Sequence, residues 1–222
     1  MKKIFLLFIG SLLTTVSMSA APKAVVFDWG NVLAHEDRNV VVEFMCKTLN
    51  LSEAEFETAN LDKRKAVKEG RSDVDFWIEF AIKKGMPLPI NWPESYKETL
   101  KASIGADPEM FAIIKDLKEK KIQTSLLSNI NDRYTKLIRD FGFYDPFEPC
   151  LLSCEIGMEK PHPEAYVALL EAIQLAPDEI VFIDDKAENV EAAQKMGIDA
   201  IVFESPTQIR KELLFRDLLK RN

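Results

Sequence analysis

The chain has 222 residues, 47% of them hydrophobic, with 8 Gly, 11 Pro and no low-complexity tract, which excludes the disordered and fibrous classes and suits one globular core with a modest insertion. Its formal net charge of -7 argues against nucleic acid as a partner, because an acidic surface repels the phosphate backbone on average. The charge does not exclude a small phosphorylated ligand, since a metal ion and a few cations gathered at one place can hold an anion.

The first segment has the three-part layout of a secretory signal peptide. Lys2 and Lys3 precede an apolar stretch from Ile4 to Val16, and small residues follow. An uncleaved membrane anchor is the alternative, but the stretch is interrupted by Gly, Ser and Thr and is shorter than the ~20 residues that a bilayer-spanning helix needs. We therefore expect residues 1–20 to be a signal peptide, the protein to be exported to the periplasm or secreted, and no stable membrane anchor to remain after the leader is removed.

Residues 36–104 carry helical patterns only, after a first strand-like run at 23–27. Ser52 followed by Glu55 forms a capping-box pattern, which is typical of a helix start. We interpret this segment as a helical cap inserted into a core domain. The core would consist of residues 21–35 and 105–222.

The rest of the chain alternates between short apolar runs and helical patterns. Together with the first run, the strand-like segments lie at 23–27, 122–127, 150–153, 180–183 and 200–203. Helical patterns with three-to-four spacing lie at 108–121, 132–142, 163–174 and 189–197. Continuous apolar runs are typical of strands buried on both faces. The alternation predicts an α/β fold in which helix layers enclose a mostly parallel sheet.

The three cysteines, Cys46, Cys150 and Cys154, have no spacing typical of a zinc site. If the run at 150–153 is a strand, the Cα atoms of Cys150 and Cys154 lie ~13 Å apart, which is too far for a disulfide within the strand. We expect buried free thiols, and the sequence leaves open whether any disulfide forms.

Polar side chains that could take part in catalysis or ligand binding fall just past the ends of four predicted strands. They are Asp28, Ser128, Lys160 and the adjacent pair Asp184 and Asp185. In an open parallel sheet, ligands bind outside the carboxyl ends of the strands, so these side chains should converge. Carboxylates, a hydroxyl and an ammonium group suit a hard divalent cation together with a phosphoryl group.

The motifs VVFDWGNVL, SLLSNIND, GMEKPHPEAY and VFIDDKAENV occur in an order that resembles the haloacid dehalogenase superfamily of phosphohydrolases. FDWGNVL resembles the branch that includes sugar-1-phosphate phosphatases and the phosphatase lobe of epoxide hydrolases. The resemblance implies a Rossmann-like three-layer core, a helical cap at 36–104, and Mg²⁺-dependent hydrolysis of a small-molecule phosphoester such as a sugar phosphate.

The resemblance also implies roles for the acidic residues. Asp28 would attack phosphorus and form an aspartyl phosphate, which divides one difficult displacement into two easier ones. Magnesium would be held by Asp28, the backbone carbonyl of Gly30, Asp184 and Asp185, with waters and a phosphate oxygen completing its octahedron.

The remaining implied roles belong to polar and basic residues. Ser128 and the amide of Asn129 would donate hydrogen bonds to the phosphoryl oxygens, and both count with Lys160 as substrate-binding. Lys160 would offset the repulsion between an anionic nucleophile and an anionic substrate, and it counts with Ser128 as catalytic. Asn189 would orient the metal-binding carboxylates.

Gly30 departs from the family pattern DxD, whose second Asp protonates the leaving alkoxide. Such a proton-transfer group contributes about 10² to 10⁴ in rate. We hypothesise that the enzyme favours leaving groups that need little protonation, such as an anomeric hydroxyl, or borrows an acid from His35, Glu36 or the cap.

Three other functions are alternatives to phosphatase activity. A haloacid dehalogenase-type hydrolase would use the same nucleophile but gains nothing from Asp184 and Asp185. A phosphonate-cleaving relative would need a cap lysine that forms a Schiff base, and no lysine of the cap stands out. A non-catalytic phosphate-binding protein of the cell envelope would have no reason to keep Asp28 and Lys160. The sequence does not indicate the oligomeric state.

Overall fold

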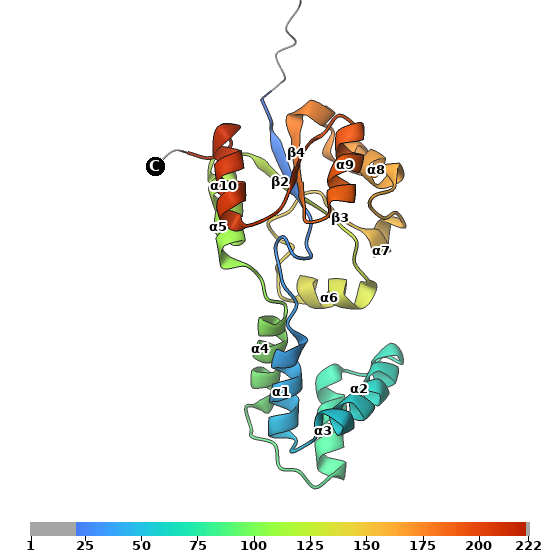
Figure 1. The fold of residues 1–222 in the computed structure, drawn as a ribbon. Helices are drawn as coiled ribbons and strands as arrows, with labels where there is room; N and C mark the ends of the chain where they lie inside the picture. Colours follow the sequence, from blue (N-terminus) through green and yellow to red (C-terminus); the bar gives the residue numbers. More distant parts are fainter. Residues whose placement is uncertain (1–20, 221–222) are drawn as a thin grey trace, which may run out of the picture.

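The computed structural model describes residues 21–220, apart from the side chain of Arg133. A five-stranded sheet lies between helices, and a separate group of helices projects from one end (Figure 1). The predicted signal peptide, residues 1–20, lies outside the described residues. The strands are β1 (Ala24–Phe27), β2 (Gln123–Ser128), β3 (Cys150–Leu152), β4 (Ile180–Asp184) and β5 (Asp199–Val202). Within residues 21–220, no helix combines the length and the hydrophobicity that a membrane crossing requires.

Ten α-helices and one short 3-10 helix accompany these strands in the described part of the chain. The helices before β2 are α1 (Arg38–Thr48), α2 (Glu53–Lys68), α3 (Asp73–Lys83), α4 (Trp92–Ser103) and α5 (Pro108–Glu119). Those after β2 are α6 (Asp132–Asp140), α7 (Ser153–Ile156), α8 (Pro163–Ile173), η1 (Pro177–Glu179), α9 (Ala187–Lys195) and α10 (Pro206–Phe215).

The sheet is parallel throughout, with the strand order β3-β2-β1-β4-β5. The first strand of the chain is therefore central, and it pairs with β2 on one side and with β4 on the other. Figure 1 shows α5 and α10 on the left of this sheet and α8 and α9 on its right. The predicted α/β class, with a mostly parallel sheet between helix layers, is confirmed.

The central strand β1 explains why its sequence is a continuous apolar run. Val25 and Phe27 belong to a hydrophobic cluster with residues of α5 and α10, whereas Ala24 and Val26 belong to a cluster with residues of α8 and α9. All four side chains are fully buried. Because burial of a Val or Phe side chain stabilises a fold by roughly 1.5 to 3 kcal/mol, both faces of β1 must be apolar.

The helices α1 to α4 form a cap between β1 and α5, with a hydrophobic core of its own. Trp77 of α3 and Trp92 and Tyr96 of α4 are each 1% exposed, and the last two rings stack with centroids 5.0 Å apart. Ser52 and Glu55 form the expected capping box at the start of α2. The predicted helical insertion between the first two strands is confirmed. In Figure 1 the cap lies beyond the carboxyl ends of the strands.

Two linkers join the cap to the core and run side by side. The His35 amide donates to the Gly105 carbonyl at 2.9 Å, and the Asp37 amide donates to the Ser103 carbonyl at 2.9 Å. Gly105 has φ +62°, and a Cβ atom there would lie 1.8 Å from the His35 carbonyl oxygen. Only glycine permits this close approach of the two linkers.

The predicted strand at 150–153 is one residue too long. Strand β3 ends at Leu152, and Ser153 starts the short helix α7, which contains Cys154. The Ser153 hydroxyl bonds the backbone of Ile130, donating to its carbonyl and accepting from its amide, and this contact fixes the turn into α7. Cys46, Cys150 and Cys154 are free thiols, but they are half-buried rather than fully buried as predicted.

The sequence reading left out helix α10. Its start carries an ordinary signal, because the Ser205 hydroxyl accepts a hydrogen bond from the Gln208 amide at 3.2 Å and Pro206 occupies the first turn. Ile209 and Leu213 of this helix complete the hydrophobic cluster on one face of the sheet.

Candidate active site

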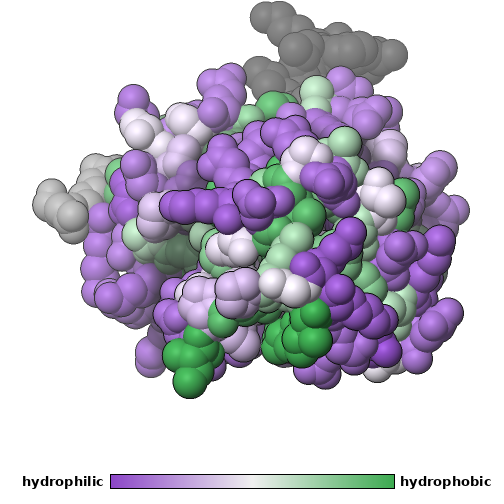
Figure 2. Space-filling view, turned by 90° about the horizontal axis from the view of Figure 1, so that it is seen from below, coloured by the Kyte–Doolittle hydropathy of each residue, from purple (hydrophilic) through white to green (hydrophobic). Residues whose placement is uncertain are grey.

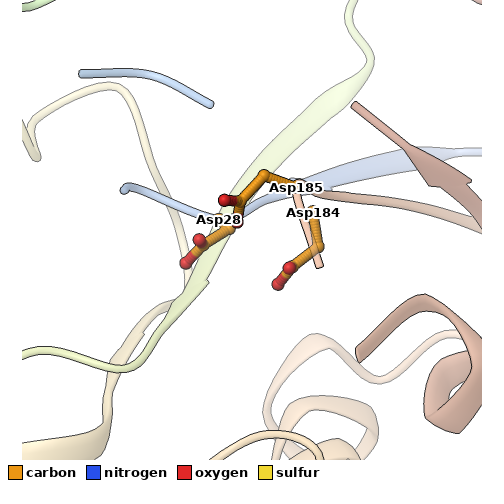
Figure 3. A group of neighbouring side chains, drawn as sticks. All are labelled: Asp28, Asp184 and Asp185. Atoms are coloured by element: carbon orange, nitrogen blue, oxygen red, sulfur yellow. The ribbon is translucent and has the colours of Figure 1, made fainter. Parts of the chain in front are cut away.

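Three carboxylates meet at the carboxyl ends of β1 and β4. The register places Phe27 opposite Ile183, and the Asp28 amide donates to the Ile183 carbonyl at 2.8 Å, so Asp28 follows β1 directly beside the end of β4. One carboxylate oxygen from each of Asp28, Asp184 and Asp185 lies within 4.8 Å of the other two. Figure 3 shows these side chains converging from the two strand ends.

Lys160 bridges two of these carboxylates. Its Nζ lies 2.8 Å from Asp28 Oδ1 and 2.6 Å from Asp184 Oδ2, and the residue is 4% exposed. The side chain of Asn129 fixes the backbone of Lys160, accepting from its amide at 2.9 Å and donating to its carbonyl at 2.7 Å. Asn129 follows Ser128, the last residue of β2, so the end of β2 determines where the lysine lies.

The expectation that Lys160 directly follows a strand is wrong. Helix α7 and a loop separate it from the end of β3. Ser128 and Asp184 likewise are the last residues of β2 and β4 rather than the first residues after them. The Asn129 side chain, which binds the lysine backbone, explains why Lys160 reaches the site without lying next to a strand.

Asp184 is fully buried and is surrounded by donors. The Asn189 side-chain amide lies 2.9 Å from both Asp184 oxygens, and the Lys186 amide donates to Asp184 Oδ1 at 2.9 Å. Asn189 reaches Asp184 from the first turn of α9. These contacts, with the Lys160 ammonium, hold one carboxylate of the group in a single orientation.

Asp185 has a different partner, which the sequence reading did not include. The side-chain amide of Asn31 donates to Asp185 Oδ2 at 2.9 Å, although the two residues lie 154 positions apart. Asn31 adopts φ 58°, a left-handed conformation that asparagine tolerates better than most residues. The Gly-Asn pair in FDWGNVL was a signal for this turn.

Burial has the largest effect on the pKa of Asp28 in this carboxylate cluster. Burial raises the pKa of Asp28 above its usual value; Lys160 lowers it, the Asp184 charge raises it, and a hydrogen bond from Ser128 lowers it. Three carboxylates lie together here and Lys160 pairs with two of them, so with all four groups ionised the cluster is net negative in a buried place. Such a cluster needs a further cation, and carboxylate oxygens are the ligands that a hard divalent cation prefers.

A cavity of about 690 Å³ opens beside this cluster. Its lining includes Gly30 from the loop after β1, Ser128 and Asn129 from the end of β2, and Glu36 from the linker to the cap. A Cβ atom at Gly30 would meet no atom within 4 Å, so the place of the missing family carboxylate is open space. His35, the other acid considered beside Glu36, is exposed and is not part of the lining.

Other residues of the lining were also missed by the sequence reading. Asp132, Tyr134, Cys154 and Glu159 border the cavity from α6, α7 and the loop before Lys160. Helix α6 lies between the sheet and the cap in Figure 1, which explains why its first turn reaches this space. No local pattern distinguishes these residues from ordinary surface side chains.

Comparison with known proteins finds similarity to hydrolases, several of them phosphatases. The profile of the haloacid dehalogenase-like hydrolases matches residues 22–197. A D-ribitol-5-phosphate phosphatase of Bacteroides thetaiotaomicron is 26% identical over 209 residues, covering 86% of this chain and 96% of the relative. A sesquiterpene phosphatase of Aspergillus oryzae is 26% identical over 178 residues, covering 79% and 87%. Bifunctional epoxide hydrolase 2 of Mus musculus is 36% identical over 67 residues, but these span only 30% of this chain and 12% of that protein.

Solved structures show the same likeness. The magnesium complex of a HAD family enzyme from Bacteroides thetaiotaomicron is 27% identical, has a TM-score of 0.50, and covers 83% of this chain and 94% of that chain. A HAD-like family hydrolase from Porphyromonas gingivalis has a TM-score of 0.52 at 22% identity, covering 88% and 98%, and supports the fold alone.

Proposed function

The chain belongs to the haloacid dehalogenase-like hydrolases, and from this membership we propose that it is a Mg²⁺-dependent phosphatase that hydrolyses a small phosphorylated metabolite through an aspartyl phosphate on Asp28. The observation that carries the proposal is the ammonium group of Lys160, which lies within hydrogen-bond distance of both Asp28 and Asp184 at the edge of an open cavity. The similarity to two phosphatases, which covers 79% and 86% of this chain, supports the reaction class.

The donor set of the site fits magnesium. Asp28, Asp184, Asp185 and the carbonyl of Gly30 would hold the ion, which prefers oxygen ligands and leaves some positions to water and substrate. When bound, the ion would neutralise charge on the phosphoryl oxygens. The magnesium complex of the Bacteroides enzyme supports this choice of ion.

The chain's own residues would divide the work on the phosphoryl group. A carboxylate oxygen of Asp28 would form a bond to phosphorus while the bond to the leaving-group oxygen breaks, and water would then cleave the acyl phosphate. Ser128, Lys160 and the amide of Asn129 would hold the phosphoryl oxygens. Asn189 would keep the orientation of Asp184, to which it is hydrogen-bonded.

The open space at Gly30 bears on the leaving group. The second carboxylate of the family motif is missing, and nothing within 4 Å of a Cβ atom there takes its place. We therefore propose that the enzyme favours substrates whose leaving groups need little protonation, such as the anomeric hydroxyl of a sugar phosphate. Among the residues suggested as a borrowed acid, Glu36 borders the cavity.

The other candidate functions receive less support. A dehalogenase would use Asp28 as its nucleophile but would gain nothing from the neighbouring carboxylates of Asp184 and Asp185. A non-catalytic envelope protein would not need a buried lysine between two carboxylates. Export remains part of the proposal: residues 1–20 would direct the protein to the periplasm or outside the cell.

A phosphate-release screen tests the proposed function. The protein without residues 1–20 is incubated with a panel of small phosphoesters, with and without Mg²⁺. We expect turnover only with Mg²⁺ and its loss in Asp28→Asn. Turnover without any metal, or equal turnover by Asp28→Asn, would contradict the proposal.

A further inference from the structure

The turn after β1 carries two of the proposed magnesium ligands and is held in place by its own contacts. Asp28 and Gly30 lie at its start, and the Asn31 amide donates to the Ala34 carbonyl at 2.9 Å. Val32, the next residue along the chain, is fully buried in the core. The side chain of Asn31 therefore extends from a backbone that is fixed on both sides.

The two carboxylates at the end of β4 are held by different partners. Asp184 is fully buried, pairs with Lys160 and accepts hydrogen bonds from the Asn189 side chain. Asp185 is half-buried, and its Oδ2 accepts a hydrogen bond from Asn31 Nδ2 at 2.9 Å. The direction of the Asp185 carboxylate thus depends on a side chain of the β1 turn.

This hydrogen bond joins two segments that would each supply ligands to the metal ion. Asp28 and the Gly30 carbonyl belong to the β1 turn, whereas Asp185 follows β4. Mg²⁺ requires a nearly ideal octahedron of oxygen atoms, so the relative placement of oxygens from the two segments affects its binding. Partners that orient the ligands of a metal ion are commonly as important for its affinity as a ligand itself.

The backbone conformation of Asn31 points the same way. Its φ of 58° is left-handed, a conformation that glycine adopts without steric cost and asparagine with a small one. A residue that keeps a side chain at such a position, with that side chain on a proposed metal ligand, points to a role for the side chain.

We infer that Asn31 is a positioning residue for magnesium: its hydrogen bond to Asp185 aligns this carboxylate with the ligands of the β1 turn and raises the affinity for the ion. The inference rests on the magnesium site of the proposed function and assigns a role to a residue outside the ligand set. Asn31 is exposed, so water can replace part of its hydrogen bond. We therefore expect an effect of about tenfold on Mg²⁺ affinity, the lower end of the usual range for such partners.

Asn31→Gly tests the inference, because glycine accepts the left-handed backbone and only the side chain is removed. Calorimetric titration of the protein without residues 1–20 with Mg²⁺ alone gives the dissociation constant in the absence of any ester. We expect this constant to rise by about tenfold in the variant. A constant within about twofold of that of the unaltered protein, or no binding of Mg²⁺ by the unaltered protein, would overturn the inference.

Asn50 provides a matched control. It has φ 46°, is exposed, lies between α1 and α2 in the cap, and is not part of the cavity lining. Both Asn→Gly substitutions make the unfolded chain more flexible, but Asn50→Gly should leave the Mg²⁺ dissociation constant unchanged. Thermal unfolding in EDTA verifies that both variants are folded. The same rise of the dissociation constant in both variants would show a general effect of the substitution and overturn the assignment to Asn31.

Kinetics separate a role in metal binding from a contact with the substrate. In Asn31→Gly, the Mg²⁺ concentration for half-maximal hydrolysis of p-nitrophenyl phosphate should rise about tenfold, whereas the KM for the ester at saturating Mg²⁺ should change by less than about threefold. A raised KM for the ester with an unchanged Mg²⁺ requirement would make Asn31 a substrate contact and overturn the inference.

The proposed function is followed separately in these experiments. The calorimetric titration needs no turnover. A protein that binds Mg²⁺ but hydrolyses no ester would therefore refute the phosphatase activity, while the dissociation constants of the unaltered protein and of Asn31→Gly would still decide the inference.

Discussion

Among the described residues, the core and the cap each bury one lysine, and the two lysines have different surroundings. Lys160 of the core and Lys63 of the cap are both 4% exposed. Lys160 lies between Asp28 and Asp184, whereas the Lys63 ammonium lies 3.1 Å from Asp73, a carboxylate of the cap itself. Both ammonium groups thus have carboxylate partners, so burial with an ion pair does not by itself indicate an active site.

The balance of charge separates the two places. Asp73 accepts a hydrogen bond from the Tyr96 hydroxyl at 3.2 Å as well as pairing with Lys63, so this network connects α2, α3 and α4. At the core site three carboxylates lie together, Lys160 pairs with two of them, and a cavity opens beside them. An excess of buried negative charge next to open space marks a place for a cation and a ligand, whereas an ion pair that connects helices of the cap away from this cavity marks a structural contact.

Replacing Lys160 should have the largest effect on activity. Lys160→Met leaves Asp28 and Asp184 without their shared ammonium group, so we expect hydrolysis of p-nitrophenyl phosphate to fall by about 10³-fold. Loss of one partner from a buried pair also lowers the free energy of unfolding, by about 3 kcal/mol. Steady-state kinetics and denaturant unfolding measure the two effects. A rate within tenfold of the unaltered protein would remove Lys160 from the proposed mechanism.

The same substitution at the buried lysine of the cap should lower the free energy of unfolding but leave the rate of hydrolysis nearly unchanged. Lys63→Met leaves Asp73 without the ammonium group, and because this carboxylate is 32% exposed we expect a loss of unfolding free energy near the lower end of the usual range, about 3 kcal/mol. The value of kcat should stay within about threefold, since Lys63 is not part of the cavity lining. A large drop in kcat with unchanged stability would place Lys63 in the chemistry and break the comparison.

The junction between core and cap offers a smaller effect. Gly105→Ala places a Cβ atom 1.8 Å from the His35 carbonyl oxygen at φ +62°, and we expect a loss of about 2 kcal/mol and a raised KM, because the linkers must separate. Gly85→Ala is the matched control: its φ is +64°, but a Cβ atom there meets nothing within 4 Å, so only the backbone strain remains. Thermal unfolding and the KM of both variants measure these effects. Similar losses in the two variants would show that the contact between the linkers is unimportant.

The parts of the fold that the sequence predicts are those determined by local burial. Strands β1 and β4 are enclosed on both faces, so their apolar runs are continuous, and an acidic residue comes directly after each run. Asp28 and Asp184 were identified from that pattern alone. The end of β3 was misjudged, because Leu151 and Leu152 are apolar whether the chain continues as a strand or turns into a helix.

The parts that escaped prediction depend on side-chain contacts between distant segments. Lys160 reaches Asp28 because Asn129, 31 positions earlier, binds its backbone, and Asn31 orients Asp185 from 154 positions away. Asp132 and Glu159 border the cavity only because the fold places α6 and the loop before Lys160 beside it. A sequence shows which residues can do such chemistry, but not which exposed carboxylates face a cavity.

The smallest expected effect concerns the missing acid at Gly30. Its φ is not positive and a Cβ atom there has open space, so Gly30→Asp should fold without strain, in contrast to a substitution at Gly105. If the absent carboxylate limits the hydrolysis rate of esters with poor leaving groups, the variant should raise the rate on an alkyl phosphate relative to an aryl phosphate by about tenfold. This gain is below the full contribution of a positioned acid, because the new side chain lacks supporting contacts. Gly30→Asn has nearly the same shape but no proton to donate, so it should leave the ratio unchanged. Equal ratios in both variants would mean that another group, with Glu36 as the first to examine, already protonates the leaving oxygen.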